Sequence, residues 1–272
     1  MQFCTIASGS SGNAYYLGLS GQHFLIDAGI SGKRVQNALY KMNIHSLNGI
    51  FITHEHRDHI TGAGVLARRF KADIYATPLT WRYFLRHNVI GAVEESQIKF
   101  IEPGRPLGIG TGVIEAFDIS HDASQPVGYT FRESAGGSSG NGAGDGAKIA
   151  FATDLGYVTD TVKEHLKGAR LLLLESNYDP EMLEKGRYHR SLKIRVAGNR
   201  GHLSNAQTGM LLAEVVVPGV THVFLAHLSE ENNTPMLAFD TVMRVLEGNN
   251  VAVKRLEIAE RHIPGELISL DT

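Results

Sequence analysis

Short runs of apolar residues, many of them β-branched or aromatic, occupy the first part of the chain. The runs at 3–7, 14–19 and 22–26 predict three strands, and Ser20-Gly21 predicts a turn between the last two. From position 31 onward, segments with the 3.6-residue period of helices alternate with further strand-like runs. This alternation predicts an α/β protein whose sheets carry helices on their outer faces.

The remaining elements follow from the same pattern and from capping residues. Pro78 and Pro235 suit the first turn of a helix, and Ser204 followed by Gln207 predicts a capping box. Helices are predicted at 31–42, 58–70, 79–87, 160–167, 180–185, 204–215 and 235–248. Strands are predicted at 49–52, 74–76, 98–101, 113–119, 128–132, 148–152, 171–175, 221–226, 251–258 and 267–270.

The segment 134–146 interrupts this pattern. It consists almost entirely of Gly, Ser, Ala and Asn and has no large apolar side chain. Such a composition cannot form a core, so we predict a flexible loop insertion without a function of its own. The whole chain, residues 1–272, is predicted to form one domain that contains this insertion.

Composition narrows the classes of function. With 272 residues, 43% of them hydrophobic, the chain can bury a large core, and a net charge of −2 excludes a protein coated in basic charge. Cys4 is the single cysteine, which excludes an internal disulfide and a thiolate-rich metal site. We find neither an export signal nor an apolar run of ~20 residues, so we expect a cytoplasmic protein without a membrane partner.

One short string carries most of the candidate chemistry. His54, His56, Asp58 and His59 follow the strand-like run 49–52 directly. A lone His-x-His pair is more often a polar loop, but three imidazoles and a carboxylate within six positions predict a metal site. One ion would leave ligands unused, so we expect two divalent ions, zinc or manganese, with iron as a third option.

Further motifs resemble a known superfamily. Asp27, the His-x-His-x-Asp-His string, His121, Asp154 and His227 occur in the order found in the metallo-β-lactamase fold, an αββα sandwich of two mixed sheets flanked by helices. The segments 7–13, 175–179, 201–205 and 225–233 resemble its YycJ/WalJ branch of bacterial DNA-directed metallohydrolases. The resemblance covers nearly the whole chain, and the insertion at 134–146 is its main departure.

The resemblance implies a division of the ligands between two metals. One metal would take His54, His56 and His121. The other would take Asp58, His59 and His227, and Asp154 would bridge the two. Asp27 matches a position that supports the ligands, which suits a carboxylate that fixes a histidine tautomer.

Two metals would activate a water molecule for attack on a phosphodiester. Asp58 would contribute to this step as a metal ligand. The leaving group still needs a proton, and His202 is our candidate donor because its motif resembles one that contacts phosphate in related nucleases. Glu175, at the end of an apolar strand, could orient His202 and raise its pKa, or it could cap a neighbouring helix.

The substrate is predicted from local charge. Between Glu184 and Glu214 the chain has no acid, and five of its cations there are predicted to contact a nucleic-acid backbone: Lys185, Arg187, Arg190, Lys193 and Arg195. A solvated basic surface is the alternative. Backbone groups near Ser204, Asn205 and Asn13 are further candidates for phosphate binding.

Three classes of function therefore remain. A nucleic-acid phosphodiesterase explains both the metals and the cations, and the resemblance narrows it to a 5′-to-3′ DNA exonuclease in repair or replication, with RNA as another possible substrate. A small ester or thioester hydrolase would use the same metals but gains nothing from the clustered cations. A noncatalytic binding module leaves the ligand set unexplained, and the sequence identifies no protein partner.

Overall fold

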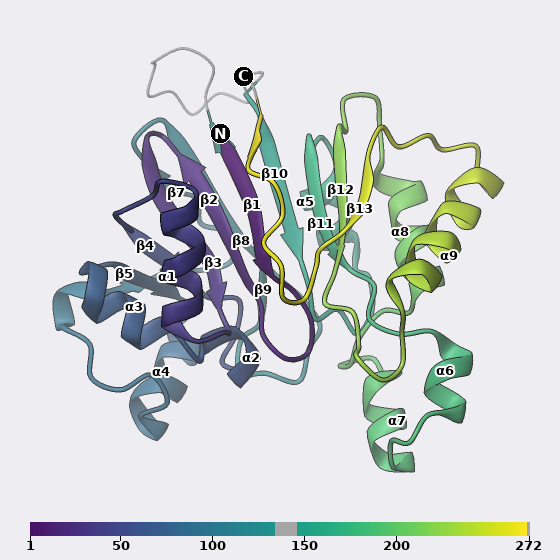
Figure 1. The fold of residues 1–272 in the computed structure, drawn as a ribbon, viewed down its shortest axis with the longest axis horizontal. Coiled ribbons are helices and arrows are strands. Elements are labelled where there is room, and N and C mark those ends of the chain that lie inside the picture. The colour runs from purple at the N-terminus through teal and green to yellow at the C-terminus, as the bar shows by residue number, and fades with distance from the viewer. Residues whose placement is uncertain (134–145, 271–272) are drawn as a thin grey trace.

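The alternating apolar runs form two mixed sheets that face each other, with helices on both outer faces (Figure 1). The computed structural model describes residues 1–133 and 146–270. Apolar side chains on the inner faces bury each sheet against the other, and those on the outer faces bury each sheet against helices. The predicted αββα sandwich is thereby confirmed.

The first sheet has the strand order β14-β1-β2-β3-β4-β5-β6. Its strands are β1 (Gln2–Ala7), β2 (Ala14–Leu19), β3 (Gln22–Ala28), β4 (Gly49–Phe51), β5 (Asp73–Ala76), β6 (Ile98–Phe100) and β14 (Ile268–Ser269). The pairs from β14 to β3 are antiparallel, and those from β3 to β6 are parallel. Ser20 and Gly21, both at positive φ, close the β2–β3 hairpin as two-residue hairpin turns require.

The second sheet has the order β13-β12-β11-β10-β9-β8-β7. Its strands are β7 (Leu107–Ile109), β8 (Gly112–Asp118), β9 (Val127–Glu133), β10 (Lys148–Ala152), β11 (Leu171–Glu175), β12 (His222–Ala226) and β13 (Leu256–Ile258). Pairing is antiparallel from β7 to β10 and parallel from β10 to β13. Each sheet thus has an antiparallel half and a parallel half.

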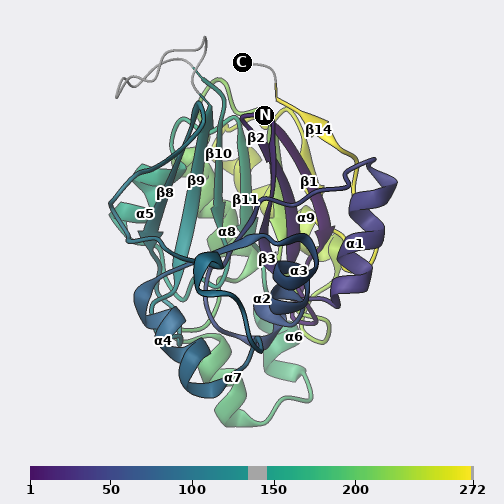
Figure 2. The same ribbon diagram turned by 90° about the vertical axis from the view of Figure 1, so that its left-hand side faces the viewer.

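Helices cover both outer faces. Those that follow strands of the first sheet are α1 (Gly32–Lys41), α2 (Arg57–Ile60), α3 (Ala63–Phe70), α4 (Pro78–His87) and the 3₁₀ turn η1 (Glu95–Gln97). Those of the second half are α5 (Asp160–Leu166), α6 (Pro180–Lys185), α7 (Arg190–Val196), α8 (Asn205–Val215) and α9 (Pro235–Gly248). Figure 2 shows α6 and α7 at the lower edge, below the two sheets. In the described part of the chain, no helix combines the length and apolarity needed to cross a bilayer.

The core between the sheets is aromatic. Tyr15 and Phe151 meet edge to face with ring centroids 4.8 Å apart, and Phe51 meets Tyr129 at 5.7 Å. These rings come from both sheets and are fully buried. Removing one such ring typically costs about 3–5 kcal/mol of stability, so this layer holds the sheets in a fixed relative position.

Several predicted elements differ in the structure. The predicted helix 58–70 is two helices, because Gly62 between them donates its N–H to Ala28 O at 2.7 Å and a Cβ there would lie 2.4 Å from Ile30 O. The predicted strand 251–258 is paired only over Leu256–Ile258. Strand β7, the turn η1 and helix α7 were not predicted. The predicted loop insertion at 134–146 lies, apart from Gly146, outside the described residues.

Candidate metal centre

The site lies where parallel strands of both sheets end at one edge of the sandwich. The His-x-His-x-Asp-His string follows β4, and Asp27 is the next-to-last residue of β3. From the second sheet, His121 follows β8, Asp154 follows β10 and His227 follows β12. Asp27, Asp154 and His227 have φ values of 57°, 63° and 54°, so the chain turns sharply at each of these positions.

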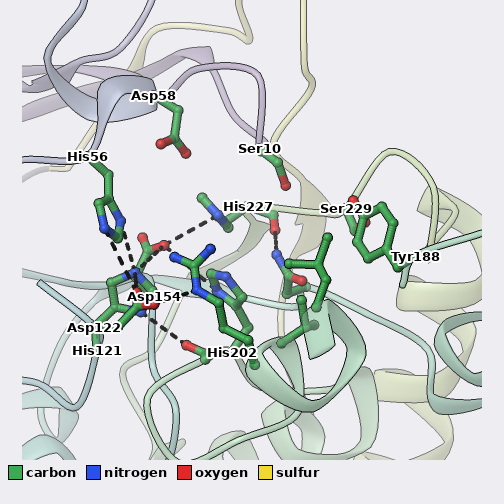
Figure 3. Close-up of a pocket in the computed structure, with 15 residues that line it drawn as sticks. Ser10, His56, Asp58, His121, Asp122, Asp154, Tyr188, His202, His227 and Ser229 are labelled. Atoms are coloured by element: carbon green, nitrogen blue, oxygen red, sulfur yellow. Dashed lines mark hydrogen bonds and ion pairs between the residues drawn. The ribbon is translucent and has the colours of Figure 1, made fainter. Parts of the chain in front are cut away.

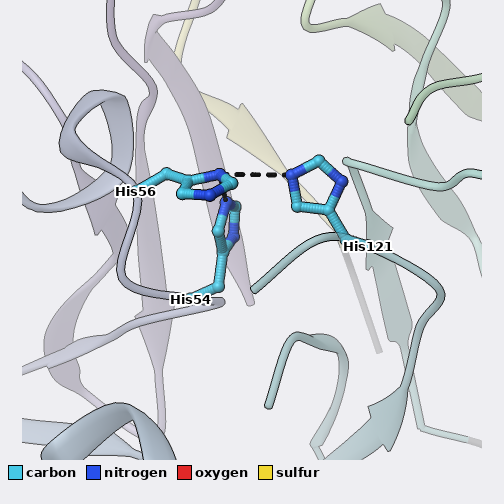
Figure 4. A group of neighbouring side chains, drawn as sticks. All are labelled: His54, His56 and His121. Atoms are coloured by element: carbon cyan, nitrogen blue, oxygen red, sulfur yellow. Dashed lines mark hydrogen bonds between the residues drawn. The ribbon is translucent and has the colours of Figure 1, made fainter. Parts of the chain in front are cut away.

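Three imidazoles converge on one point (Figure 4). His54 Nε2 lies 3.0 Å from His56 Nδ1, and His121 Nε2 lies 3.2 Å from the same His56 atom. Tetrahedral zinc with Zn–N bonds of about 2.0–2.1 Å separates its ligand nitrogens by about 3.3–3.4 Å. Two of the three separations are therefore close to those in a metal coordination tetrahedron, and His54 and His121 each bring a ligand atom within 4.8 Å of the other.

A second group adjoins the first. Asp58, His59 and His227 bring one ligand atom each within 4.8 Å of one another. Asp154 lies between the two groups: its Oδ1 is 3.7 Å from His121 Nε2 and 3.4 Å from His227 Nε2, and its Oδ2 is 3.3 Å from His59 Nε2. The structure thus brings all seven predicted ligands into one cluster. His54 also has ligand spacing with His59 and Asp154, so the division of the ligands between two ions stays a prediction.

The charges in this cluster favour a cation. Burial would lower the pKa of His59, but the carboxylates of Asp27, Asp154 and Asp58 outweigh burial and raise that pKa well above its usual range. Burial would likewise raise the pKa of Asp154, but the surrounding imidazoles hold it well below the usual range. Burial lowers the pKa of His54 well below its usual range. Ionised carboxylates and a neutral imidazole are the forms that bind divalent metals.

Unsatisfied atoms point to the same conclusion. Asp154 Oδ2 and His227 Nδ1 are buried and make no hydrogen bond to any described residue. Leaving a buried polar atom without a partner costs about 1–3 kcal/mol, so such atoms call for an explanation. For Asp154 the neighbouring imidazole nitrogens complete the set of donors that a divalent ion needs. The His/Asp cluster fits divalent metal ions.

A buried network holds His59 in place. Asp27 is fully buried, and its Oδ2 lies 2.7 Å from His59 Nδ1. The same carboxylate accepts hydrogen bonds from the backbone N–H of Thr53 at 2.8 Å and from its hydroxyl at 2.9 Å. Because these donors saturate Asp27, His59 keeps its proton on Nδ1 and presents Nε2 to the cluster.

Asn13 belongs to this network rather than to the pocket lining. Its side chain is fully buried, with Nδ2 3.3 Å from the backbone O of Asp58 and 3.3 Å from His59 Nε2. Its Oδ1 accepts a hydrogen bond from the Tyr15 hydroxyl at 3.2 Å. Sequence analysis predicted a substrate contact for Asn13, whereas the structure places it beneath the cluster.

Glu175 and His202 form a pair beside the cluster. Glu175 ends β11, is fully buried, and accepts hydrogen bonds from the backbone N–H groups of Leu155 and Leu203. Its Oε2 lies 3.0 Å from His202 Nδ1. Burial and the nearby Asp154 carboxylate raise the pKa of Glu175 to about 8. His202 also joins His121 and Asp154 in a group with metal-ligand spacing, which sequence analysis did not foresee.

A pocket of about 210 Å³ opens over the cluster. His56, His121 and Asp122 lie toward one side of it, and Ser10, Ser229 and Tyr188 toward the other (Figure 3). Sequence analysis missed Asp122, which accepts a hydrogen bond from Arg195 Nε and lies 3.4 Å from His121 Nε2. Its position directly after His121 was the available signal.

The five predicted phosphate-binding cations lie in different surroundings. Arg195 on α7 lines the pocket and pairs with Asp122. Lys185 pairs with Glu181 one helical turn away, and Lys193 donates to the backbone O of Glu184. Arg187 and Arg190 are exposed and lie outside the pocket lining.

The start of α8 has no free groups for phosphate among those predicted. Gln207 Oε1 accepts from the backbone N–H of Ser204 at 2.9 Å, and Tyr178 O accepts from that of Asn205 at 2.9 Å. The Asn205 side chain is fully buried and bonded to Ser176 and Asn233. Ser204 and Asn205 therefore brace the loop around His202 instead of facing the pocket.

Comparisons with known proteins place the chain in a family. A family model described as a β-lactamase superfamily domain matches residues 22–228. Exodeoxyribonuclease YycJ of Bacillus anthracis is 39% identical over 93% of this chain and 92% of its own length. Exodeoxyribonuclease WalJ of Streptococcus pneumoniae is 37% identical over 93% of this chain and 90% of its own length.

Solved structures share the fold at lower identity. Zinc-bound PqqB from Methylobacterium extorquens has a TM-score of 0.70, 15% identity, and coverage of 98% of this chain and 100% of its own. The metallo-β-lactamase fold protein YhfI from Bacillus subtilis has a TM-score of 0.67, 15% identity, and coverage of 97% and 98%. The chain belongs to the β-lactamase superfamily and, within it, to the family of the YycJ and WalJ exodeoxyribonucleases.

Proposed function

We propose that this hydrolase is a phosphodiesterase with two divalent metal ions, zinc or manganese, and that it degrades DNA in the 5′-to-3′ direction. The observation that carries the proposal is the pair of ligand groups, with Asp154 between them, beside one pocket. Two-metal sites of this kind are typical of phosphodiester hydrolysis. The identity to two named exodeoxyribonucleases over more than nine tenths of the chain supports DNA as substrate.

In the proposed assignment, His54, His56 and His121 would hold one ion, Asp58, His59 and His227 would hold the other, and Asp154 would serve both. When bound, the ions supply a nucleophilic water at neutral pH and neutralise charge on the phosphate. The chain itself orients the ligands: Asp27 fixes His59, and Asn13 holds the Asp58 backbone. These buried contacts keep the donor atoms in place before substrate arrives.

His202 is proposed to protonate the leaving oxygen. Its Nδ1 faces Glu175, so Nε2 is the nitrogen left for substrate, and the ring lines the pocket. A carboxyl group behind an imidazole fixes its tautomer and orientation. Glu175 therefore acts as a positioning residue for His202. Burial lowers the pKa of His202 and raises that of Glu175 to about 8, so the predicted rise in the pKa of His202 is wrong.

The pocket walls favour a phosphodiester over a small neutral ester. Arg195 stands at the rim with its guanidinium held by Asp122, and Tyr188 offers a partly exposed ring. Arg and Tyr are the side chains that bind phosphate and stack on bases. A neutral ester or thioester would gain nothing from the cation.

The test is a substrate panel with added Mn²⁺ or Zn²⁺. We expect cleavage of DNA labelled at its 5′ end with early release of labelled mononucleotide, gradual shortening of the 3′-labelled strand, and no turnover of a chromogenic lactam. RNA in the same panel measures sugar preference. Asp154→Ala, the matched control, should stay folded and be inactive on every substrate. Lactam or thioester cleavage without DNA cleavage would overturn the proposal.

A further inference from the structure

A second hollow adjoins the active-site pocket. It is a groove of about 550 Å³, and His121 lines both it and the pocket. The loop after β8, which begins at Ile119, supplies several residues of the groove lining. A substrate strand that leaves the pocket on this side enters the groove directly.

Three loops form a rigid floor for the groove. Ser120 donates its hydroxyl to Asn199 O at 2.5 Å and accepts a hydrogen bond from Gly156 N at 2.7 Å. A Cβ at Gly156 would lie 2.2 Å from Asn199 O, so only glycine lets these backbones approach so closely. His121 Nδ1 lies 3.1 Å from Gly201 O, which ties the same floor to the metal centre.

Two exposed side chains stand above this floor. Tyr157 follows Gly156 and is 48% exposed. Arg200 follows Asn199, is exposed, and makes no ion pair or hydrogen bond with any described residue. An unpaired guanidinium next to an exposed aromatic ring is the combination that binds a single nucleic-acid strand, with phosphate on the cation and base on the ring.

We propose that this groove is a second subsite, which holds the single-stranded segment of the substrate adjacent to the cleaved phosphate. Arg200 contacts a phosphate of that segment, and Tyr157 stacks on one of its bases. This inference rests on the proposed function. It adds to that function a preference for DNA strands long enough to occupy the groove as well as the pocket. Among the described residues that line the groove, Asp118, exposed at the end of β8, is the one carboxylate, and it opposes phosphate binding.

The test compares long and short substrates. With a single-stranded oligonucleotide, we expect Tyr157→Ala to raise Kd by roughly 5- to 100-fold, the range for loss of one base stack, and Tyr157→Phe to bind normally. Arg200→Ala should raise Kd and lower the slope of log K against log salt by about 0.7, the value for one phosphate contact. Asp118→Asn should lower Kd. Two exposed residues provide matched controls outside the groove. Arg244→Ala on α9 removes a cation, and Tyr40→Ala on α1 removes an aromatic ring.

A bis-nitrophenyl phosphodiester distinguishes the two proposals, because it fills the pocket without reaching the groove. Loss confined to the oligonucleotide, in KM rather than kcat, supports the second subsite. Equal loss on both substrates would place Arg200 or Tyr157 at the reacting centre and overturn it. Normal oligonucleotide binding by both variants would overturn the subsite while leaving the phosphodiesterase intact. A wild-type protein that cleaves neither substrate overturns the proposed function itself.

Discussion

The buried side chain of Asp27 orients a predicted metal ligand, His59, without being a ligand itself. Both of its oxygens accept hydrogen bonds, one from Thr53 N–H and the other from the Thr53 hydroxyl and His59 Nδ1. Residue 27 therefore needs a hydrogen-bond acceptor at both of its side-chain oxygen positions. An amide cannot meet that demand, because its NH₂ group would face either His59 or the Thr53 N–H.

We therefore expect Asp27→Asn to weaken metal binding by about 10- to 100-fold, the usual effect of losing a carboxylate behind a histidine ligand. If the amide NH₂ faces His59, Nδ1 must accept and the proton moves to Nε2, the nitrogen that faces the cluster. Competition with a chelating dye measures the affinity. Asp73→Asn, at the start of β5, is the control for the same chemical change elsewhere in the sheet. Unchanged affinity would remove Asp27 from the support of the centre.

His202 can be separated from the ligands by its substrate dependence. We expect His202→Ala to keep both metal ions and lose DNA cleavage by about 10²- to 10⁴-fold, the range for general acid catalysis. A nitrophenyl phosphodiester, whose leaving group needs no proton, should be affected much less. Metal content and both rates are measured on one preparation.

Loss of a metal ion in His202→Ala would instead make His202 a ligand, since it also has ligand spacing with His121 and Asp154. The assignment of His227 would then need revision. Glu175→Gln is the companion variant, and it should lower DNA cleavage while His202 stays in place.

At the scale of elements, the turn after β3 and the start of α2 are joined backbone to backbone. A Cβ at Gly29 would lie 1.6 Å from Asp58 O, and that same oxygen accepts the N–H of Asn13 at 2.8 Å. The loop carrying Asp58 can move away only by breaking this hydrogen bond. Glycine at position 29 thus allows the Asp58 backbone, from which the ligand carboxylate extends, to lie at this position.

Gly29→Ala should consequently destabilise the protein by at least ~1–3 kcal/mol, the range for steric overpacking, and abolish turnover. Urea denaturation and DNA cleavage provide the two measurements. Gly108→Ala is the control, because a Cβ at Gly108 meets no described atom within 4 Å. A variant with normal stability and activity would contradict this account of the loop.

The cations of the predicted basic segment lie on α6, on α7 and between the two helices, and we expect them to differ in their contribution to DNA binding. Arg190→Glu should weaken DNA binding and reduce its salt dependence by about one unit of slope, because Arg190 is exposed at the helix start. Lys185→Ala should have little effect, since Lys185 already pairs with Glu181. Titration of labelled DNA at several salt concentrations checks both. Unchanged DNA binding in both variants would make the whole segment a solvated surface, and equal weakening would contradict the separate role given to Lys185.

Local patterns predicted most of the fold and the ligand cluster, because strand ends and capping residues leave clear marks in the sequence. The His-x-His-x-Asp-His string could be assigned from spacing alone, whereas His121, Asp154 and His227 needed the family resemblance. Asp122 directly follows His121, but its role depends on Arg195 of α7 and was missed. The split at Gly62 could not be predicted, because it depends on a close contact with Ile30 O. Helix α7 was missed because cations dominate its surface and Val196 is its one buried residue.

For the whole molecule, the important fact is that each ligand group draws on both sheets. His54 and His56 come from the first sheet and His121 from the second, and Asp58 and His59 likewise meet His227. Bound ions would therefore link the two layers of the sandwich across their shared edge. Metal binding and folding are then coupled.

Removing the metals should lower the melting temperature. At an ion concentration of about 1,000 times Kd, binding contributes about 4 kcal/mol, and each kcal/mol shifts Tm by roughly 2–4 °C in a chain of this size. We expect a fall of about 10 °C on chelation, measured by calorimetry. Asp154→Ala should show a clearly smaller shift. A Tm that does not respond to chelation would contradict coupling through the ligands.

The left-handed backbone at Asp27, Asp154 and His227 has an evolutionary consequence. Each of these non-glycine residues holds a conformation that costs of the order of 1 kcal/mol and that glycine adopts freely. Selection for backbone conformation alone would favour glycine at all three positions. The presence of Asp27, Asp154 and His227 means that the contacts of these side chains within the cluster outweigh the cost of their backbone conformation.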